Sequence, residues 1–547
     1  MLIMTKKYLK FAAVAGVLLI SLSAFSGPRN KYFDILKNLE IFSNLYKEIN
    51  TYYVDDVDPG QLMRTGIDAM MESLDPFTNY ISESQIEGYR YMTEGKYNGI
   101  GAISEQMGKY VTIVELYEDQ AADKAGLKPG DKIIAVDGKD AVDKSPEAVN
   151  NILRGFPGTE VELTIRRPGR EGDFNVTLQR SEVQVPNVPY SGMVSEDIGY
   201  VALTTFTREA GKNVGDAVRA LKEENPELKG VIFDLRGNGG GLLTEAVNVS
   251  NVFIPRGEVV VTTKGKVKEW DRSFSTTGTP VDTEIPLVVL INDRSASASE
   301  IVSGVMQDYD RGVLIGQRSY GKGLVQNTRD IGYNSKLKLT TAKYYIPSGR
   351  CIQSVEYEDG EPVDIPDDQR TPFKTRNGRT VLDGGGVKPD LTIKKFTDAG
   401  IVKSLIDQHL IFDFVTAHVQ GIDSIGAVEE YRFEDFDAFV AFLDAQAFDY
   451  DSESEKLLKE LKETAEEEGY EIDERIAALE AEIDASKQNA LQQNRDIITD
   501  LIEKEVASRF HYQRGKIKMG LRNDKEIKDA IELLGDSARY QELLSAQ

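Results

Sequence analysis

The sequence has very few of the residues on which several common kinds of site depend. Among its 547 residues it has one cysteine, Cys351, so it can form neither an internal disulfide nor a cysteine-based zinc site. Its three histidines, His409, His418 and His511, all lie in the last third of the chain. A Ser-His-Asp triad needs a histidine beside its nucleophile, and no His-Glu-x-x-His pattern is present. We therefore interpret the histidines as surface or helix-packing residues and expect no metal and no cofactor.

Positive charge is also scarce. The chain has 65 Lys and Arg against 90 Asp and Glu, which gives a net charge of −25. Nucleic acid is therefore not an expected partner, because binding its phosphates requires many cations. The acidity is uneven, since residues 401–547 hold 34 acidic and 17 basic residues. This C-terminal segment is a compositionally distinct unit.

The N-terminus has the features of an export signal. Lys6, Lys7 and Lys10 precede the apolar run Phe11–Phe25, and small residues follow at Ala24 and Ser26. The run is shorter than the roughly 20 residues of a comfortable transmembrane helix. We expect a signal peptide over residues 1–26 and an extracytoplasmic protein, in the bacterial periplasm. An uncleaved signal would instead anchor the protein to the inner membrane.

The rest of the chain divides by its hydrophobic periodicity. Helical spacing dominates residues 27–95, and short strands separated by glycine turns follow over residues 96–182. Apolar strands alternate with amphipathic helices over residues 183–395, which predicts βαβ units and a mostly parallel sheet. Residues 396–547 are acidic and helical, without a sustained coiled-coil repeat. The expected fold is therefore multidomain α/β.

A serine cluster is the most concentrated signal for chemistry. The segment Ser295-Ala296-Ser297-Ala298-Ser299-Glu300 lies where the apolar strand Leu287–Ile291 meets an amphipathic helix. A serine at such a turn lies at the carboxyl end of the sheet, beside free N–H groups and the positive end of a helix dipole. On spacing alone, Ser297-x-x-Glu300 fits a helix capping box equally well.

A catalytic serine without a histidine needs another base, and Lys322 is the best candidate. A neutral lysine can act as a base, which near pH 7 requires its pKa to fall about three units from ~10.4. Burial in an apolar pocket supplies such a shift. Gln326, four residues later, can orient the lysine without adding charge. The alternative is a solvated lysine in the glycine-rich turn Gly321–Gly323.

A glycine run supplies a third element. The strand Val231–Leu235 leads into Arg236-Gly237-Asn238-Gly239-Gly240-Gly241, and glycines at a strand end leave backbone N–H groups free to face a ligand. The Gly-x-x-x-x-Gly-Lys-[Ser/Thr] pattern of a phosphate loop is absent. One N–H from this run and one from Ala298 would form an oxyanion hole.

These motifs, with several others, resemble the carboxyl-terminal processing proteases, also called tail-specific proteases. The additional matching segments are Asp75–Tyr80, Gly99–Ala102, Ala125–Asp131, Ala342–Tyr344, Pro347–Gly349 and Gly384–Asp390. The resemblance implies a Ser-Lys peptidase on a crotonase-like, or ClpP-like, αβ core with an inserted PDZ domain. It places the PDZ domain at 96–182, the core at 183–395 and helical regions at 27–95 and 396–547.

Carried over by position, the resemblance implies Ser297 as nucleophile, Lys322 as general base and Gln326 as its support. It implies oxyanion donors at Ala298 and Gly241. The PDZ loop Gly99-Ile100-Gly101-Ala102 would bind the carboxylate of a free, apolar substrate C-terminus. The expected function is an exported serine endopeptidase that acts on protein tails, and the chain could form a homo-oligomer. A crotonase-like hydratase acting on thioesters and a catalytically silent PDZ adaptor are the alternatives.

Overall fold

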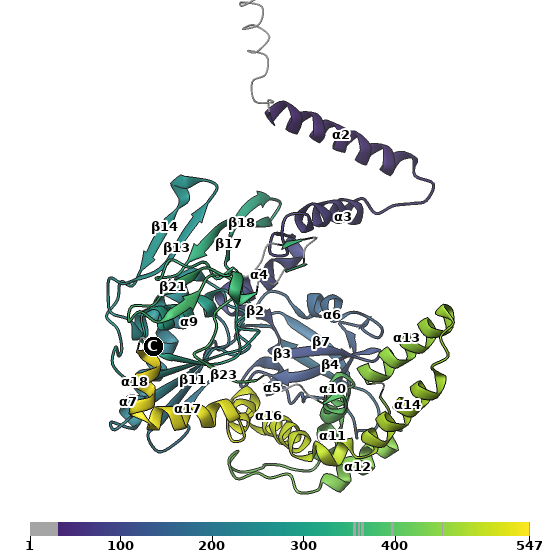
Figure 1. Cartoon of the computed structure of the whole chain (residues 1–547). Coiled ribbons are helices and arrows are strands. Elements are labelled where there is room, and N and C mark those ends of the chain that lie inside the picture. The colour runs from purple at the N-terminus through teal and green to yellow at the C-terminus, as the bar shows by residue number, and fades with distance from the viewer. Residues whose placement is uncertain are drawn as a thin grey trace, which may run out of the picture. The chain divides into compact units, whose positions relative to one another are not determined.

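The computed structural model describes residues 31–353, 357–358, 361–362, 366–394, 399–450 and 452–545. The expected signal peptide lies outside these residues. The chain divides into two compact units, Met1–Leu74 and Asp75–Gln547, and Figure 1 shows their elements. Within the part that is described, no helix combines the length and the apolar character needed to cross a membrane.

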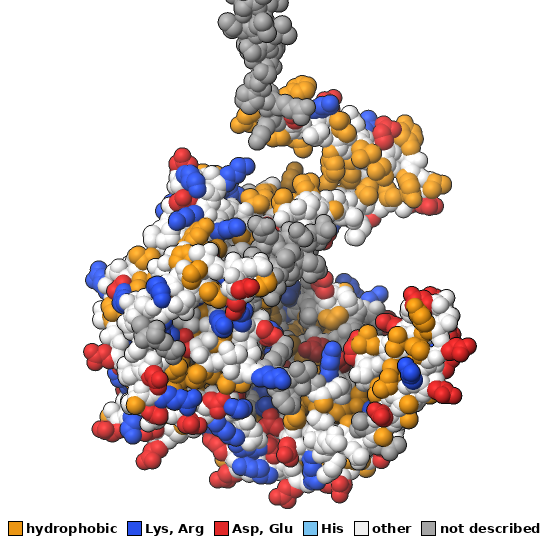
Figure 2. Space-filling model, in the orientation of Figure 1, with side chains coloured by type: hydrophobic (Ala, Val, Ile, Leu, Met, Phe, Trp, Pro, Cys, Tyr) orange, Lys and Arg blue, Asp and Glu red, His pale blue; other side chains and the backbone are white. Residues whose placement is uncertain are grey.

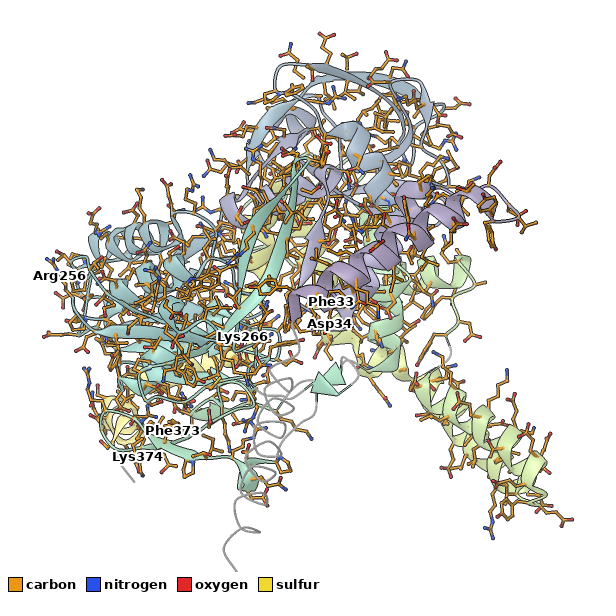
Figure 3. The ribbon with its side chains drawn as sticks, turned by 90° about the horizontal axis from the view of Figure 1, so that it is seen from above. Phe33, Asp34, Arg256, Lys266, Phe373 and Lys374 are labelled. Atoms are coloured by element: carbon orange, nitrogen blue, oxygen red, sulfur yellow. The ribbon has the colours of Figure 1, made fainter. Side chains whose placement is uncertain are left out.

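The first unit consists, as described, of two helices, α2 (Lys31–Tyr52) and α3 (Pro59–Glu72). Asp58 caps α3 by accepting a hydrogen bond from the Gln61 N–H, and Pro59 begins the helix. Large apolar side chains of α2 are exposed, and Figure 2 shows them in orange along the helix. Figure 3 marks the start of α2 by Phe33 and Asp34.

The periodicity predicted a helical region over residues 27–95, but this region also contains a strand. After Asp75 the chain forms β1 (Asn79–Ile81) before helix α4 (Ile86–Glu94). Strand β1 pairs antiparallel with β18 (Ser335–Tyr345), more than 250 residues later. A three-residue strand has too little periodicity to be recognised without its partner.

The PDZ region is a small antiparallel sheet closed by helix α6 (Pro146–Leu153). Its strand order is β3-β4-β5-β7-β8. The strands are β3 (Ala102–Met107), β4 (Tyr110–Leu116), β5 (Lys132–Val136), β7 (Glu160–Arg166) and β8 (Phe174–Gln179). At its base, β2 (Lys96–Gly99) pairs with β9 (Ser181–Gln184), so the region's entry and exit lie side by side.

The predicted parallel sheet is present in residues 190–392. Its order is β10-β11-β12-β15-β16-β23, and every pair except β10 with β11 is parallel. The strands are β10 (Tyr190–Met193), β11 (Ile198–Ala202), β12 (Gly230–Asp234), β15 (Leu287–Ile291), β16 (Val313–Gly316) and β23 (Leu391–Thr392).

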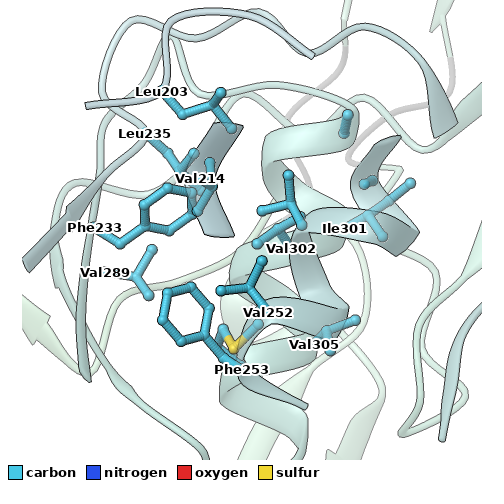
Figure 4. Close-up of a cluster of buried hydrophobic side chains, with 14 of the residues drawn as sticks. Leu203, Val214, Phe233, Leu235, Val252, Phe253, Val289, Ile301, Val302 and Val305 are labelled. Atoms are coloured by element: carbon cyan, nitrogen blue, oxygen red, sulfur yellow. The ribbon is translucent and has the colours of Figure 1, made fainter. Parts of the chain in front are cut away.

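Both faces of this sheet are covered, which explains why β15 is apolar throughout. Leu287, Val289 and Ile291 face one buried cluster, whereas Val288 and Leu290 face another. The first face packs against helices α7 (Ala210–Glu224), α8 (Leu243–Phe253) and α9 (Ala298–Asp308). Figure 4 shows side chains of this cluster.

The second face is covered by the end of the chain, which the sequence assigned to a separate helical region. Helix α17 (Lys525–Gly535) contributes Ile527, Leu533 and Leu534 to the cluster, and α18 (Ser537–Leu544) contributes Tyr540 and Leu544. The Tyr540 hydroxyl accepts a hydrogen bond from the Leu287 N–H at 2.9 Å and donates to the Leu287 carbonyl at 3.1 Å. The last two helices therefore complete the core around the parallel sheet, because the sheet needs a second apolar layer.

The other C-terminal helices have their own buried cluster. It is built from α10 (Gly400–Asp407), α11 (Leu410–His418), α12 (Phe436–Ala445) and α16 (Arg495–Leu521). His418 stacks on Phe414 and meets the edge of Phe433, which fits a helix-packing histidine. Two acidic helices, α13 (Glu453–Glu468) and α14 (Asp473–Gln488), project from this bundle in Figures 1 and 3.

A second sheet lies beside the serine cluster and follows the order β1-β18-β13-β14, with β17 also paired to β18. Its longest pair is β17 (Leu324–Gly332) with β18, interrupted by a bulge between Val325 and Gln326. A hairpin in this sheet is formed by β13 (Val259–Gly265) and β14 (Arg272–Ser275). This sheet carries several of the side chains that surround the candidate site.

Candidate active site

The three serines before α9 have different environments. Ser295 and Ser299 are fully buried, and each hydroxyl donates a hydrogen bond at 2.8 Å to the glycine-run loop, at the carbonyls of Leu235 and Asn238. These two serines join the loop to the turn. Ser297 is partly exposed and lines a cavity of about 470 Å³. The middle serine is therefore the one that a substrate can reach.

Ser297 also has an unusual backbone conformation. Its φ of +56° and ψ of −111° place a non-glycine residue in the left-handed half of the map. Such a conformation costs on the order of 1–3 kcal/mol and persists only where surrounding structure enforces it. Here the turn is held by the hydrogen bonds that the Ser295 and Ser299 hydroxyls donate and by the one that the Ser297 N–H donates to Glu300. A strained serine between a strand and a helix is the arrangement expected of an exposed nucleophile.

The glycine run fits closely against this turn. A Cβ on Gly240 would lie 2.8 Å from the Ser297 Cβ, and a Cβ on Gly241 would lie 2.5 Å from the Phe206 carbonyl oxygen. Both positions therefore require glycine. Gly241 and Ala298 line the cavity, and no described residue accepts a hydrogen bond from either N–H. These are the two groups predicted as oxyanion donors.

Lys322 lines the same cavity. Its Nζ lies 4.2 Å from the centroid of the Phe77 ring. Burial, followed by repulsion from Lys338, lowers the pKa of Lys322 to about 8, although Glu300 and Asp75 act in the opposite direction. The prediction of a lysine with a lowered pKa therefore agrees with its surroundings. Among the described residues, no hydrogen bond joins its Nζ to the Ser297 Oγ.

A buried carboxylate connects the serine turn with the lysine loop. Glu300 is fully buried and accepts four hydrogen bonds. Two come from the N–H groups of Ser297 and Lys322, both at 2.8 Å. The other two come from the Gly321 N–H and the Ser319 hydroxyl, both at 2.6 Å. Burial raises the pKa of Glu300, and these donors oppose that shift.

Glu300 therefore resolves the two interpretations of Ser297-x-x-Glu300. The carboxylate does accept the N–H of the residue that precedes the helix, as in a capping box. It uses its remaining acceptor sites to fix the loop that carries the lysine. The capping contact therefore coexists with a Ser297 side chain that lines the cavity.

Tyr344 also connects the serine turn with the lysine loop. This buried tyrosine lies on β18, and its hydroxyl lies 3.1 Å from the Ser297 carbonyl oxygen and 2.6 Å from the Lys322 carbonyl oxygen. Glu300 holds the two N–H groups and Tyr344 holds the two carbonyls. The backbones of the predicted nucleophile and the predicted base are therefore fixed by two buried side chains.

Gln326 lines the cavity, but its recorded hydrogen bond is not to the lysine. Its Nε2 donates to the Thr340 hydroxyl at 3.1 Å, and that hydroxyl donates to the Asp75 carboxylate at 3.2 Å. Asp75 also accepts the N–H groups of Phe77 and Thr78. This chain of contacts places Phe77 at the lysine, so the role of Gln326 as direct support remains a prediction.

Four residues of the site were not identified from the sequence as participants. Glu300 was considered only as a cap, and Phe77 and Tyr344 appeared only inside motifs of the resemblance. Lys338 carries no local motif. The Asp75–Tyr80 motif could have pointed to Phe77, because its sequence does not fit the helical pattern of the residues around it. These four residues come from three separate parts of the chain, because Lys338 and Tyr344 both lie on β18.

The predicted PDZ loop borders a second cavity, of about 240 Å³. Gly99, Ile100 and Ala102 line it, together with Leu153 of α6 and three tyrosines, Tyr91, Tyr97 and Tyr117. Gly101 does not line it; it has a φ of +80° and accepts the Tyr117 N–H on its carbonyl. Strand β3 pairs only with β4 among the described strands, so its other edge is open toward α6.

Comparison with known proteins agrees with this arrangement. Residues 197–361 match the model of peptidase family S41, residues 112–167 match a PDZ domain, and residues 401–534 match the C-terminal helical domain of a probable PDZ-protease. A carboxy-terminal-processing protease of Bartonella bacilliformis is 34% identical over 392 residues, which cover 71% of this chain and 89% of the relative. The chain belongs to peptidase family S41.

Two further relatives illustrate the range of this family. A probable CtpA-like serine protease of Staphylococcus aureus is 33% identical over 60% of this chain and 65% of its own length. The solved photosystem II D1 C-terminal processing protease is 26% identical, covers 64% of this chain and 92% of its own, and has a TM-score of 0.34. The family models and the Bartonella relative, which is covered to 89% of its length, show that this S41 chain is a serine protease of the carboxy-terminal processing type, with a PDZ domain and a helical C-terminal domain.

Proposed function

We propose that this S41 protein is an exported endopeptidase that cleaves proteins at or near their C-termini by a Ser297–Lys322 dyad on a crotonase-like core. The observation that carries the proposal is a single cavity lined by a partly exposed serine, a partly buried lysine and two backbone N–H groups that no described residue accepts. Each of these supplies one requirement of acyl transfer: a nucleophile, a base and an oxyanion site.

The first half of the reaction forms an acyl-enzyme. Neutral Lys322 takes the proton of the Ser297 hydroxyl as the Oγ attacks the scissile carbonyl carbon. The N–H groups of Ala298 and Gly241 donate to the resulting oxyanion. The tetrahedral intermediate collapses, the C–N bond breaks, and the lysine ammonium gives its proton to the leaving amine.

The second half of the reaction restores the enzyme. Water enters in place of the released amine, and Lys322 takes one of its protons as the oxygen attacks the ester carbonyl. Collapse of the second intermediate breaks the bond to the Ser297 Oγ, which recovers a proton from the lysine. Only side chains of this chain move protons in this scheme, and we expect chelators to leave the rate unchanged.

The PDZ groove supplies substrate selection in this proposal. A free C-terminus adds as a strand to the open edge of β3, and the Gly99–Ala102 loop receives its carboxylate. The pocket formed by Ile100, Leu153 and the three tyrosines accepts an apolar last side chain. Amidating the peptide, or ending it in Asp, should therefore slow its cleavage.

Export rests on the composition of residues 1–26. If the signal peptide is removed, the protein would be soluble in the periplasm. If it is kept, the protein would stay at the inner membrane. Fractionation of cells that express the chain with a C-terminal tag, with N-terminal sequencing of the product, distinguishes the two. Recovery of the full-length protein in the cytoplasm would contradict export. Self-association is a separate proposal, which sedimentation of the purified protein tests.

The decisive experiment uses unstructured peptides with a free apolar C-terminus. Wild-type protein should release fragments and react covalently with a serine-directed phosphonate, whereas Ser297→Ala should do neither while keeping the same melting temperature. Ser303→Ala, on the same helix but outside the cavity, is the matched control and should remain active. A wild-type protein that binds the peptides without cleaving them would instead be an adaptor.

A further inference from the structure

A second lysine, Lys338, shares the cavity with Ser297 and Lys322. It lies on β18 opposite Thr328 of β17. Tyr344 of the same strand also lines this cavity, and Lys338 is only partly exposed there.

The charged side chains that line this cavity are all positive. Its titratable lining residues are the two lysines and the tyrosines Tyr89, Tyr91 and Tyr344, and no Asp or Glu is among the described residues that line it. Lys338 makes no ion pair with any described carboxylate. By contrast, Lys336 on the same strand pairs with Asp330. The ammonium of Lys338 is therefore uncompensated.

The two amines compete for protons, because they face one low-dielectric space. Lys322 is approached by Lys338 from β18, Glu300 from α9, Asp75 from the segment before β1, and the Tyr344 hydroxyl. Burial and then Lys338 lower the pKa of Lys322, and the two carboxylates raise it. The pKa of Lys338 is lowered by burial alone.

We propose that Lys338 sets the charge of the catalytic cavity, and that it thereby keeps Lys322 neutral and disfavours basic side chains in the substrate. Lys338 is a positioning and specificity residue in this scheme, because its effect on the bond-breaking steps passes through Lys322. This inference rests on the proposed function, since it concerns the same cavity.

The first test is the pH dependence of kcat/KM for a peptide that the wild-type protein cleaves. Lys322 acts when it is neutral, so the wild-type rate should rise with pH and level off above about 8. Removing the positive charge with Lys338→Met should move this rise upward by roughly half a pH unit or more, with about a threefold loss at pH 7. Lys338→Arg keeps the charge and should stay near the wild-type profile.

The second test is substrate choice. The substrates are peptides that differ only at one of the three positions on either side of the scissile bond, where they have Lys, Gln or Glu. Peptides with Glu or Gln should be cleaved faster than those with Lys. The preference should be about tenfold for the most sensitive position and should largely disappear in Lys338→Met. Lys343→Met, an exposed lysine on the opposite face of β18, is the matched control and should retain the wild-type profile and preference.

These outcomes separate the inference from the proposed function. A wild-type protein that cleaves no peptide contradicts the proposed function. A cleaving wild type whose pH profile and Lys discrimination are unchanged in Lys338→Met overturns the role of Lys338 and leaves the dyad intact. A Lys338→Arg variant that behaves like Lys338→Met also overturns it. Lys338→Gln replaces Lys338→Met if the latter has a lower melting temperature.

Discussion

The catalytic cavity and the PDZ groove differ in how their backbone groups are used. Around the cavity, the backbones of Ser297 and Lys322 are fixed by buried hydrogen bonds to Glu300 and Tyr344. Along the groove, the edge of β3 that faces away from β4 has no partner strand among the described residues. Chemistry at a fixed carbonyl needs positions held to within tenths of an ångström, whereas capture of varied tails needs open donors and acceptors.

The difference implies that changes at the cavity should act on the rate of bond breaking, and changes at the groove on substrate affinity. Four substitutions test this contrast, and they are ordered by the size of the effect that we expect.

Lys322→Ala should have the largest effect, because it removes the group that we propose as the general base in both halves of the reaction. We expect a loss of about 10³-fold or more in kcat, with an unchanged melting temperature. Lys322→Arg should be equally inactive, since a guanidinium stays protonated at all working pH values. Steady-state assays beside thermal melts provide the measurement, and a near-normal rate for either variant would show that the dyad is assigned wrongly.

Glu300→Gln should lower kcat by about 10- to 100-fold. The amide keeps one acceptor oxygen but turns an NH₂ toward donors that need acceptors, which should also reduce the free energy of unfolding by about 2 kcal/mol. Because Glu300 raises the pKa of Lys322, its removal should shift the pH–rate profile downward. That direction is opposite to the one expected for Lys338→Met. An upward shift would contradict the electrostatic account of the site.

Ile100→Asp tests the PDZ groove, which Ile100 lines. A carboxylate in the apolar pocket repels the substrate carboxylate, so KM should rise by about tenfold for free-acid peptides with little change in kcat. Peptides with an amidated C-terminus should be poor substrates of the wild type and should lose little more in the variant. If kcat falls and KM stays constant, the groove affects catalysis and not capture.

Tyr344→Phe should have the smallest effect of the four. It removes a hydroxyl that lies near two carbonyls, and one lost hydrogen bond is worth on the order of 1 kcal/mol, which corresponds to about a fivefold loss in kcat. The pH profile should keep its midpoint, because the phenol is neutral throughout the working range. A shifted midpoint would mean that Tyr344 takes part in proton transfer.

Much of the local structure was predictable from the sequence. The continuous apolar run Leu287–Ile291, predicted as a strand, gives a strand that is buried on both faces. The helix predicted after the serine cluster begins at Ala298. These elements were recognisable because hydrophobic periodicity, glycine turns and helix caps are properties of a few neighbouring residues.

By itself, the sequence therefore determined the order of strands and helices, the motifs that contain Ser297 and Lys322, and the absence of a histidine near them. Only the tertiary structure decided which distant residues complete the site. Phe77 and Lys338 reach Lys322 through β18, which pairs with β1 and β17, and the far end of the chain covers the sheet beneath. Burial and neighbouring charge set the proton affinity of Lys322, and both arise only when these segments, remote in sequence, enclose one cavity.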